Sequence, residues 1–138
     1  MKNIKSKILH ASLKTILTLI LIMPIFGSLG FFPEPTRDLY NTDKAFNFIN
    51  ILTNDAAYIS YLISFIFIIT LFLLWTKREA LAALLVAPIT INIIGFHLFL
   101  DGGLLTSGAI LGNVLLLLNI YFLWKNRDQY NNLLDKRS

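Results

Sequence analysis

The sequence contains no cysteine among its 138 residues. Such a chain can form no disulfide bond and can offer no thiolate to a metal ion or a substrate. It has only two histidines, His10 and His97, which stand far apart in the sequence. A zinc site gathers three or four cysteine, histidine or carboxylate ligands in one place. We therefore expect no thiol chemistry and no metal centre.

Charged residues are also scarce. They make up 14% of the chain, whereas soluble domains contain about 25%. Hydrophobic residues make up 56%, and four long stretches carry no charge: 15–33, 56–76, 80–100 and 102–124. Each stretch is close to the roughly 20 residues that a helix needs to span a membrane. The composition thus predicts an integral membrane protein and leaves little material for a soluble catalytic domain.

The spacing of these stretches predicts an all-α transmembrane bundle. We expect spanning helices at about 15–32, 56–75, 80–100 and 104–124, an outer loop at 33–55 and a tail at 125–138. Only residues 76–79 link the second and third helices, and only Asp101-Gly102-Gly103 links the third and fourth. Short links make consecutive helices antiparallel neighbours. The expected fold is one membrane domain, 1–138, with up-down-up-down topology.

The basic residues gather on one side of this arrangement. Only Arg37 and Lys44, of twelve lysines and arginines, fall in the outer loop. The other ten flank the opposite helix ends: Lys2, Lys5, Lys7, Lys14, Lys77, Arg78, Lys125, Arg127, Lys136 and Arg137. The positive-inside rule then places both termini in the cytoplasm, with the chain in the inner membrane of the cell. The net charge of +4 reflects topology, and we expect no nucleic-acid partner.

The first apolar stretch has a second interpretation. Lysines precede it, and Ser28-Leu29-Gly30 resembles a signal-peptide cleavage site. Its neutral run is longer than a usual signal core, and Pro24 and Gly27 are typical of a helix packed inside a bundle. We favour the bundle helix. Charge does not decide between the two, because the other helices would keep their orientation without it.

A short helix is predicted within the outer loop. Pro33-Glu34-Pro35 cannot continue a helix. From residue 42 to residue 52, apolar residues recur at helical spacing, at Ala45, Phe48, Ile49 and Leu52. This pattern is typical of an amphipathic helix lying on the membrane surface. The loop is either an ordered segment packed over the mouth of the bundle or a lid over a substrate.

Small residues predict where the helices touch. The third helix carries Ala83, Ala87 and Gly95 along one ridge, and the fourth carries Gly108 and Gly112 in a GxxxG pattern. Such residues let helix backbones approach closely in membranes. Pro88 removes one hydrogen bond of the third helix and is expected to kink it.

Two asparagines are expected to meet in the middle of the membrane. Asn92 lies about nine residues, and Asn113 about ten residues, from the outer ends of adjacent helices at about 1.5 Å per residue. A hydrogen bond between them would fix the register of the helices. Alternatively, with Thr90 and Ser64 they line a polar pocket for a lipid headgroup or a quinone ring.

His97 stands four residues before Asp101, so the two side chains share a helix face near the outer surface. The carboxylate can then hold one imidazole nitrogen and leave the other facing the bundle. This geometry suits a proton relay or, more simply, a structural hydrogen bond.

The residues Ala87-Pro88-Ile89, Asn92 and Phe96-His97-Leu98-Phe99-Leu100-Asp101 resemble the second half of the DoxX-type small membrane proteins, as do Asn119, Trp124 and Arg127 after them. Phe26-Gly27, Phe31-Phe32 and the Pro-rich loop resemble the first half. The resemblance implies a four-helix membrane protein. Some relatives are subunits of quinone-linked or thiol-stress redox complexes. Similar proteins often carry Asn-Lys before the paired aromatics, where this chain has Leu29-Gly30, and an acid near the position of Phe67.

These departures favour a DoxX-like protein that is not catalytic alone and serves as a membrane subunit or anchor. Its expected partners are membrane lipids and either another protein or a second copy of the chain. A first alternative is a quinone-binding subunit of an oxidoreductase, with quinone as the cofactor near Asn92, His97 and Asn113. A second alternative is a small protein that handles a lipid or a solute.

Overall fold

The computed structural model describes residues 2–134, and these residues form helices and loops with no strand among them. Four helical segments are long and apolar enough to cross a membrane. They contain α1 (Lys2–Ser28), α3 (Ala57–Trp75), α4 (Glu79–Phe99) and, after the 3-10 turn η2 (Ser107–Ala109), α5 (Ile110–Lys125). The predicted all-α architecture with four long apolar helices is confirmed.

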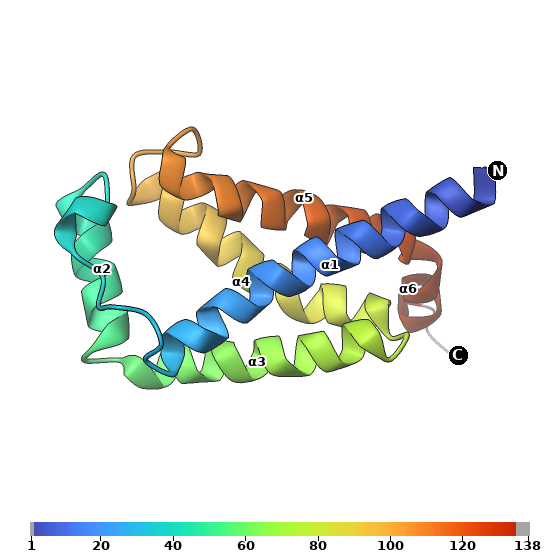
Figure 1. Cartoon of the computed structure of the whole chain (residues 1–138), viewed down its shortest axis with the longest axis horizontal. Coiled ribbons are helices and arrows are strands. Elements are labelled where there is room, and N and C mark those ends of the chain that lie inside the picture. The colour runs from blue at the N-terminus through green and yellow to red at the C-terminus, as the bar shows by residue number, and fades with distance from the viewer. Residues whose placement is uncertain (1, 135–138) are drawn as a thin grey trace.

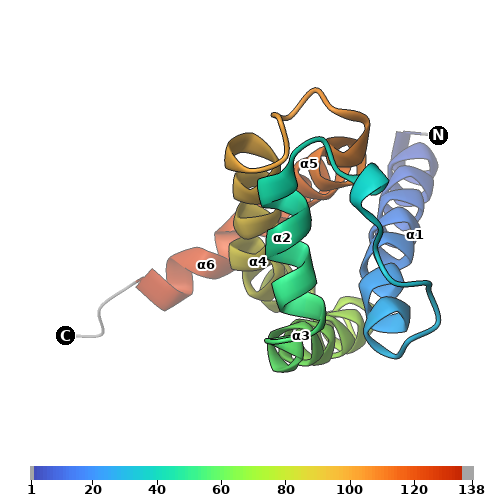
Figure 2. The same cartoon turned by 90° about the vertical axis from the view of Figure 1, so that its left-hand side faces the viewer.

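The long helices surround one apolar core. Helix α4 packs against α3 and α5, while α1 packs against α3 and α5 from the other side, as the end view in Figure 2 shows. Figure 1 shows α2 (Asp43–Thr53) and the α4–α5 connection at one end, which we call the α2 end. The start of α1, the α3–α4 turn and α6 (Arg127–Leu134) lie at the other, the α6 end. The largest fully buried apolar side chains of this core are Leu21, Phe67, Leu74, Val86, Leu115 and Phe122.

Helix α1 begins and ends earlier than the expected 15–32. It starts at Lys2, so its basic residues belong to the helix instead of preceding it. It ends at Ser28 because Gly30 adopts a φ of 80°. The Phe31 N–H then donates to the Phe26 carbonyl and the Gly30 N–H to the Gly27 carbonyl, while the rings of Phe26 and Phe31 meet at 5.4 Å. This is a Schellman motif with its hydrophobic contact.

The connection between α4 and α5 is longer than the three residues expected, and α5 begins at Ile110 instead of near residue 104. Gly102 and Gly103 adopt φ values of 85° and 110°, which glycine tolerates best. The Gly103 N–H returns to the His97 carbonyl at 2.8 Å. The following loop is held by the Asn113 side chain, whose Nδ2 donates to the Leu104 carbonyl at 2.7 Å. The glycines therefore reverse the chain, but a loop and the turn η2 separate them from the start of α5.

A helix is present where the outer-loop pattern predicts one. After the 3-10 turn η1 (Arg37–Leu39), α2 spans Asp43–Thr53, and Thr42 caps it by accepting a hydrogen bond from the Ala45 N–H. Ala45 is fully buried, whereas Phe48 is 42% exposed. The Phe48 ring nonetheless packs on the Phe96 ring of α4, with 5.8 Å between the ring centroids.

The predicted tail contains a helix that the sequence pattern did not indicate. Helix α6 packs beside α4, and the Tyr130 hydroxyl donates to the Ala80 carbonyl at 2.9 Å. Burial of this phenol raises its pKa. Residues 135–138 of the predicted tail lie outside the described part of the chain.

The expected ridge of small residues on α4 is only partly used for packing. Ala83 is buried and Ala87 is half-buried, but a Cβ built on Gly95 would meet no atom within 4 Å. The prediction that a neighbouring helix approaches the backbone closely is therefore wrong at Gly95. Helix α4 runs through Pro88 without interruption from Glu79 to Phe99, and Pro88 itself is exposed.

Candidate functional site

His97 and Asp101 meet at the α2 end, where the sequence spacing predicts them. The Nδ1 atom of His97 lies 3.0 Å from the Oδ2 atom of Asp101. Both side chains are largely enclosed, with 12% and 2% of their surfaces exposed. The carboxylate therefore fixes the orientation of the imidazole ring.

Asp101 also fastens the outer loop to the bundle. Its second oxygen, Oδ1, accepts a hydrogen bond from the Asn41 N–H at 2.9 Å. Beside it, the Thr42 hydroxyl donates to the Leu100 carbonyl. Tyr40 precedes Asn41 in the loop. Its pKa is raised, mainly by burial and to a lesser extent by the charge of Asp101. A single buried carboxylate thus joins the end of α4, the imidazole and the segment leading into α2.

The glycines of the GxxxG pattern make room for this pair. A Cβ on Gly108 would lie 3.3 Å from Asp101 Oδ2 and 3.7 Å from His97 Cε1. One on Gly112 would lie 3.0 Å from Ile93 Cγ2 and 3.5 Å from His97 Cδ2. Both glycines therefore lie against the end of α4, but side chains of Ile93, His97 and Asp101, instead of a closely approaching backbone, fill the space beside them.

The free nitrogen of His97 faces the bundle. A cavity of about 200 Å³ adjoins the ring, with a wall drawn from all four long helices. The Nε2 atom lies on the Gly112 side of the ring, 3.8 Å from the position of a Cβ there. We call this space the His97 groove; it is lined by Ile20, Leu21, Met23, Pro24, Phe67, Ile93, His97, Gly108, Leu111, Gly112 and Leu115. His97 is the one ionisable side chain in this lining.

Asn92 and Asn113 do not pair, so this expectation is wrong. Asn92 is exposed on α4, and its Nδ2 donates to the Pro88 carbonyl of its own helix at 2.9 Å. Asn113 binds the Leu104 carbonyl instead. The expectation placed Asn113 about ten residues inside a helix, whereas α5 starts only three residues before it. The longer connection therefore shifts Asn113 toward the α2 end.

The other two predicted polar residues are buried and make backbone contacts. The Thr90 hydroxyl donates to the Val86 carbonyl at 3.0 Å, and the Ser64 hydroxyl lies 3.4 Å from the Pro24 carbonyl of α1. A buried amide that was not proposed as a site residue joins two helices. Asn119, which is 3% exposed, donates to the Ala83 carbonyl at 2.9 Å. The sequence offered one signal for it, since Asn119 is a second asparagine in the same apolar stretch, six residues after Asn113.

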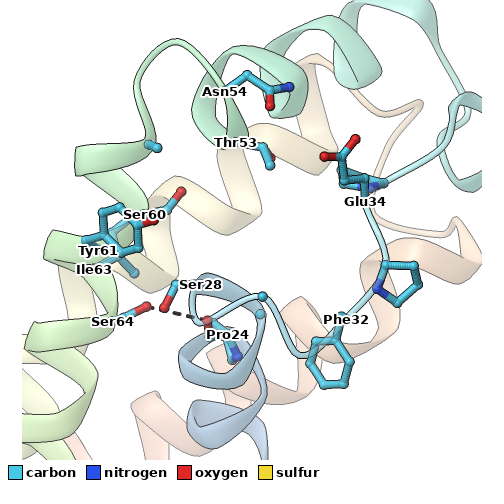
Figure 3. A pocket seen from close by; sticks show the side chains of 15 residues that line it. Pro24, Ser28, Phe32, Glu34, Thr53, Asn54, Ser60, Tyr61, Ile63 and Ser64 are labelled. Carbon is cyan, nitrogen blue, oxygen red and sulfur yellow. Dashed lines mark hydrogen bonds between the residues drawn. The ribbon is translucent and has the colours of Figure 1, made fainter.

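A larger cavity of about 490 Å³ lies at the α2 end, between the end of α1, the extended chain after it and the start of α3. Figure 3 shows Glu34 on one side of this cavity, opposite Ser60 and Tyr61, with Ser64 and Pro24 at its base. We call it the Glu34 cavity. Of the predicted residues, only Ser64 lines it, while His97 lines the groove.

The α6 end contains a charged cluster that the sequence analysis missed. Glu79, whose side chain is 15% exposed, lies 2.9 Å from His10 Nε2, 3.2 Å from Lys14 Nζ and 3.3 Å from Lys125 Nζ. The Tyr121 hydroxyl contacts the same imidazole at 3.2 Å. The sequence contains a signal for this cluster. Glu79 is an acid among basic residues, and His10 and Lys14 are four residues apart, so they share a helix face. We call this group the Glu79 cluster.

Within residues 2–134, no three histidine, aspartate or glutamate side chains gather closely enough to hold a metal ion. No family model, curated protein or solved structure matches the chain in the comparisons.

Proposed function

We propose that the chain is a DoxX-like, multi-pass protein of a bacterial inner membrane with both termini in the cytoplasm. Its four long apolar helices would cross the bilayer in up-down-up-down order, with α2 lying on the outer surface. Support comes from the distribution of basic residues: Lys5, Lys7, Lys14, Lys77, Arg78, Lys125 and Arg127 belong to segments of the α6 end.

Within that topology, the protein serves as a membrane subunit or anchor without catalysis of its own. One observation carries this role: the start of α1 extends past the other helices at the α6 end, as Figure 1 shows. In the first two turns of α1, which we call the α1 extension, Ile4 and Ile8 are 63% and 61% exposed, beside the basic Lys5 and Lys7. An apolar surface flanked by lysines suits a cytoplasmic protein that offers an apolar groove with acidic edges.

The polar side chains inside the bundle support the same role. Ser64, Thr90 and Asn119 each bond a backbone carbonyl, and Asp101 fastens the outer loop. These groups hold the fold together, as a scaffold requires.

A photo-crosslinking amino acid at Ile8 tests the anchor role in native membranes. We expect a discrete protein adduct from this position. The matched control is Leu117, a 67% exposed residue in the middle of α5, which should yield only lipid adducts. Identical adducts from Ile8 and Leu117 would contradict an anchor that uses the α1 extension.

A second function, binding of a quinone, is favoured by the His97 groove. Asp101 holds Nδ1, so Nε2 remains for a ligand: it can accept from a quinol hydroxyl when the ring is neutral and donate to a quinone carbonyl when the ring is protonated. The groove is otherwise apolar, which suits such a ring. A short-chain quinone should then raise the thermal unfolding temperature of the wild type but not of His97→Gln. Equal protection of both proteins would exclude His97 as the contact.

A further inference from the structure

The Glu34 cavity differs from the His97 groove in its walls. Its lining contains hydroxyl groups from three segments, one carboxylate and no lysine, arginine or histidine. The segments are the end of α1, the α2–α3 junction and the first two turns of α3. A volume of about 490 Å³ is within the usual range of small-ligand sites, roughly 300–1,000 Å³.

The four serine and threonine hydroxyl groups of this wall share one property: each donates its proton to a backbone carbonyl. Ser28 donates to Ile25 at 2.9 Å, Thr53 to Ile49 at 2.9 Å, Ser60 to Leu52 at 3.0 Å and Ser64 to Pro24 at 3.4 Å. A hydroxyl whose proton is engaged keeps its oxygen lone pairs as acceptors. These four side chains therefore offer hydrogen-bond acceptors to a ligand.

Glu34 adds the charge. Arg37, the nearest basic residue in the sequence, is held elsewhere, since its guanidinium binds the Asp43 carboxylate and the Tyr40 carbonyl. In Figure 3 the Glu34 carboxylate lies at the edge of the cavity, facing the α3 side chains across it. A wall with one carboxylate and several acceptor oxygens repels phosphate and attracts a cation that donates hydrogen bonds.

We propose that the Glu34 cavity binds a primary ammonium group. Such a group carries one positive charge and three N–H donors, which match the carboxylate and the hydroxyl oxygens. Tyr61 and Phe32, which also line the cavity, add aromatic faces that attract cations. Two sources offer this chemistry, a free amine and the headgroup of phosphatidylethanolamine.

Purified full-length protein in detergent tests the proposal by its thermal unfolding temperature. Ethanolamine should raise this temperature in the wild type, and choline, which has no N–H donor, should raise it less. Glu34→Gln should weaken the apparent ethanolamine affinity by about tenfold, the usual effect of losing one charged hydrogen bond. Asp55→Asn is the matched control, because Asp55 is an exposed acid outside the lining and its loss changes the net charge equally.

The lipid arm uses phosphatidylethanolamine nanodiscs, with phosphatidylglycerol nanodiscs as reference. Stabilisation by the lipid with none by ethanolamine identifies the headgroup as the source, and stabilisation by both identifies the ammonium group alone as sufficient. In either case Glu34→Gln must reduce it. A second variant, Ala57→Phe, fills the cavity without changing charge and must reduce it too.

Three results would overturn the proposal: no stabilisation in either arm, equal stabilisation in wild type and Glu34→Gln, or choline acting as well as ethanolamine. None of these readouts depends on His97 or on the α1 extension.

Discussion

Each end of α4 carries one acid, and the two acids are used differently. Glu79, at the first residue of α4, is surrounded by side chains of His10 and Lys14 from α1 and of Lys125 from α5. Asp101, just past the last turn, binds His97 in that turn and the backbone N–H of Asn41. One acid therefore joins three helices, whereas the other joins a helix to a loop.

The difference shows which end is suited to ligands. The Glu79 carboxylate faces three basic groups, so its negative charge is compensated within the protein. At the α2 end, Asp101 occupies only Nδ1 of His97, and Glu34 faces a cavity. Glu34 and His97, which line cavities, lie at this end. The α6 end is suited to holding α1, α4 and α5 together.

Asp101→Ala should have the largest effect on stability. It removes a buried acceptor of two hydrogen bonds and leaves the Asn41 N–H and the His97 ring without their partner. Hydrogen bonds to charged groups contribute about 1.5–3 kcal/mol each, so we expect the unfolding free energy in detergent to fall by about 3 kcal/mol. Asp55→Ala, an exposed control, should change it by less than about 0.5 kcal/mol. A loss as small as the control's would mean that Asp101 does not fasten the loop.

Glu79→Gln should have the next largest effect. It leaves Lys14 and Lys125 near each other without the compensating charge. Breaking a fully buried pair costs about 3–5 kcal/mol, and the cluster is partly solvated, so we expect a loss of about 2 kcal/mol. The double variant Glu79→Gln/Lys14→Gln should regain part of the lost unfolding free energy, because one of the two facing lysine charges is removed. The control is Asp128→Asn in the exposed pair with Arg127, which should change little.

Two glycine substitutions should act in opposite directions. Gly112→Leu forces a side chain against Ile93 and His97 and should cost about 1–3 kcal/mol. Gly95→Ala meets open space in the same bundle and should be neutral or stabilise the helix by up to about 1 kcal/mol. Equal destabilisation by both would place Gly95 at an interface as well.

The smallest effect is expected between the two asparagines that were predicted to pair. In a double-mutant cycle, Asn92→Leu and Asn113→Leu should be additive within about 0.5 kcal/mol, since each amide binds a different carbonyl. A coupling well above that value would show that the amides meet.

The sequence predicts what depends on composition and local spacing. Long neutral stretches reveal the four helices, the i, i+4 spacing reveals the His97–Asp101 pair, and the 42–52 pattern locates α2. These features arise within one helix or from burial in an apolar solvent. The Schellman ending at Gly30 and the loop after Gly103 depend on backbone conformations that composition does not specify.

Contacts between distant segments were not predictable in the same way. The Glu79 cluster joins residues more than 40 positions apart, and the Glu34 cavity needs the chain after α1 to cross over the start of α3. The Asn92–Asn113 pairing failed because it counted depth from a helix start that the structure places later. An error of a few residues at a helix end is enough to move a side chain a full turn.

The topology is the claim on which these assignments depend, and the absence of native cysteine makes it directly measurable. Asp55→Cys and Asp128→Cys place one thiol near each end of the bundle, at exposed positions. The cells are used with the outer membrane permeabilised and the inner membrane intact. A maleimide that cannot cross the inner membrane should then label Asp55→Cys directly. It should label Asp128→Cys only after lysis. Labelling of Asp128→Cys before lysis, with Asp55→Cys protected, would contradict the account.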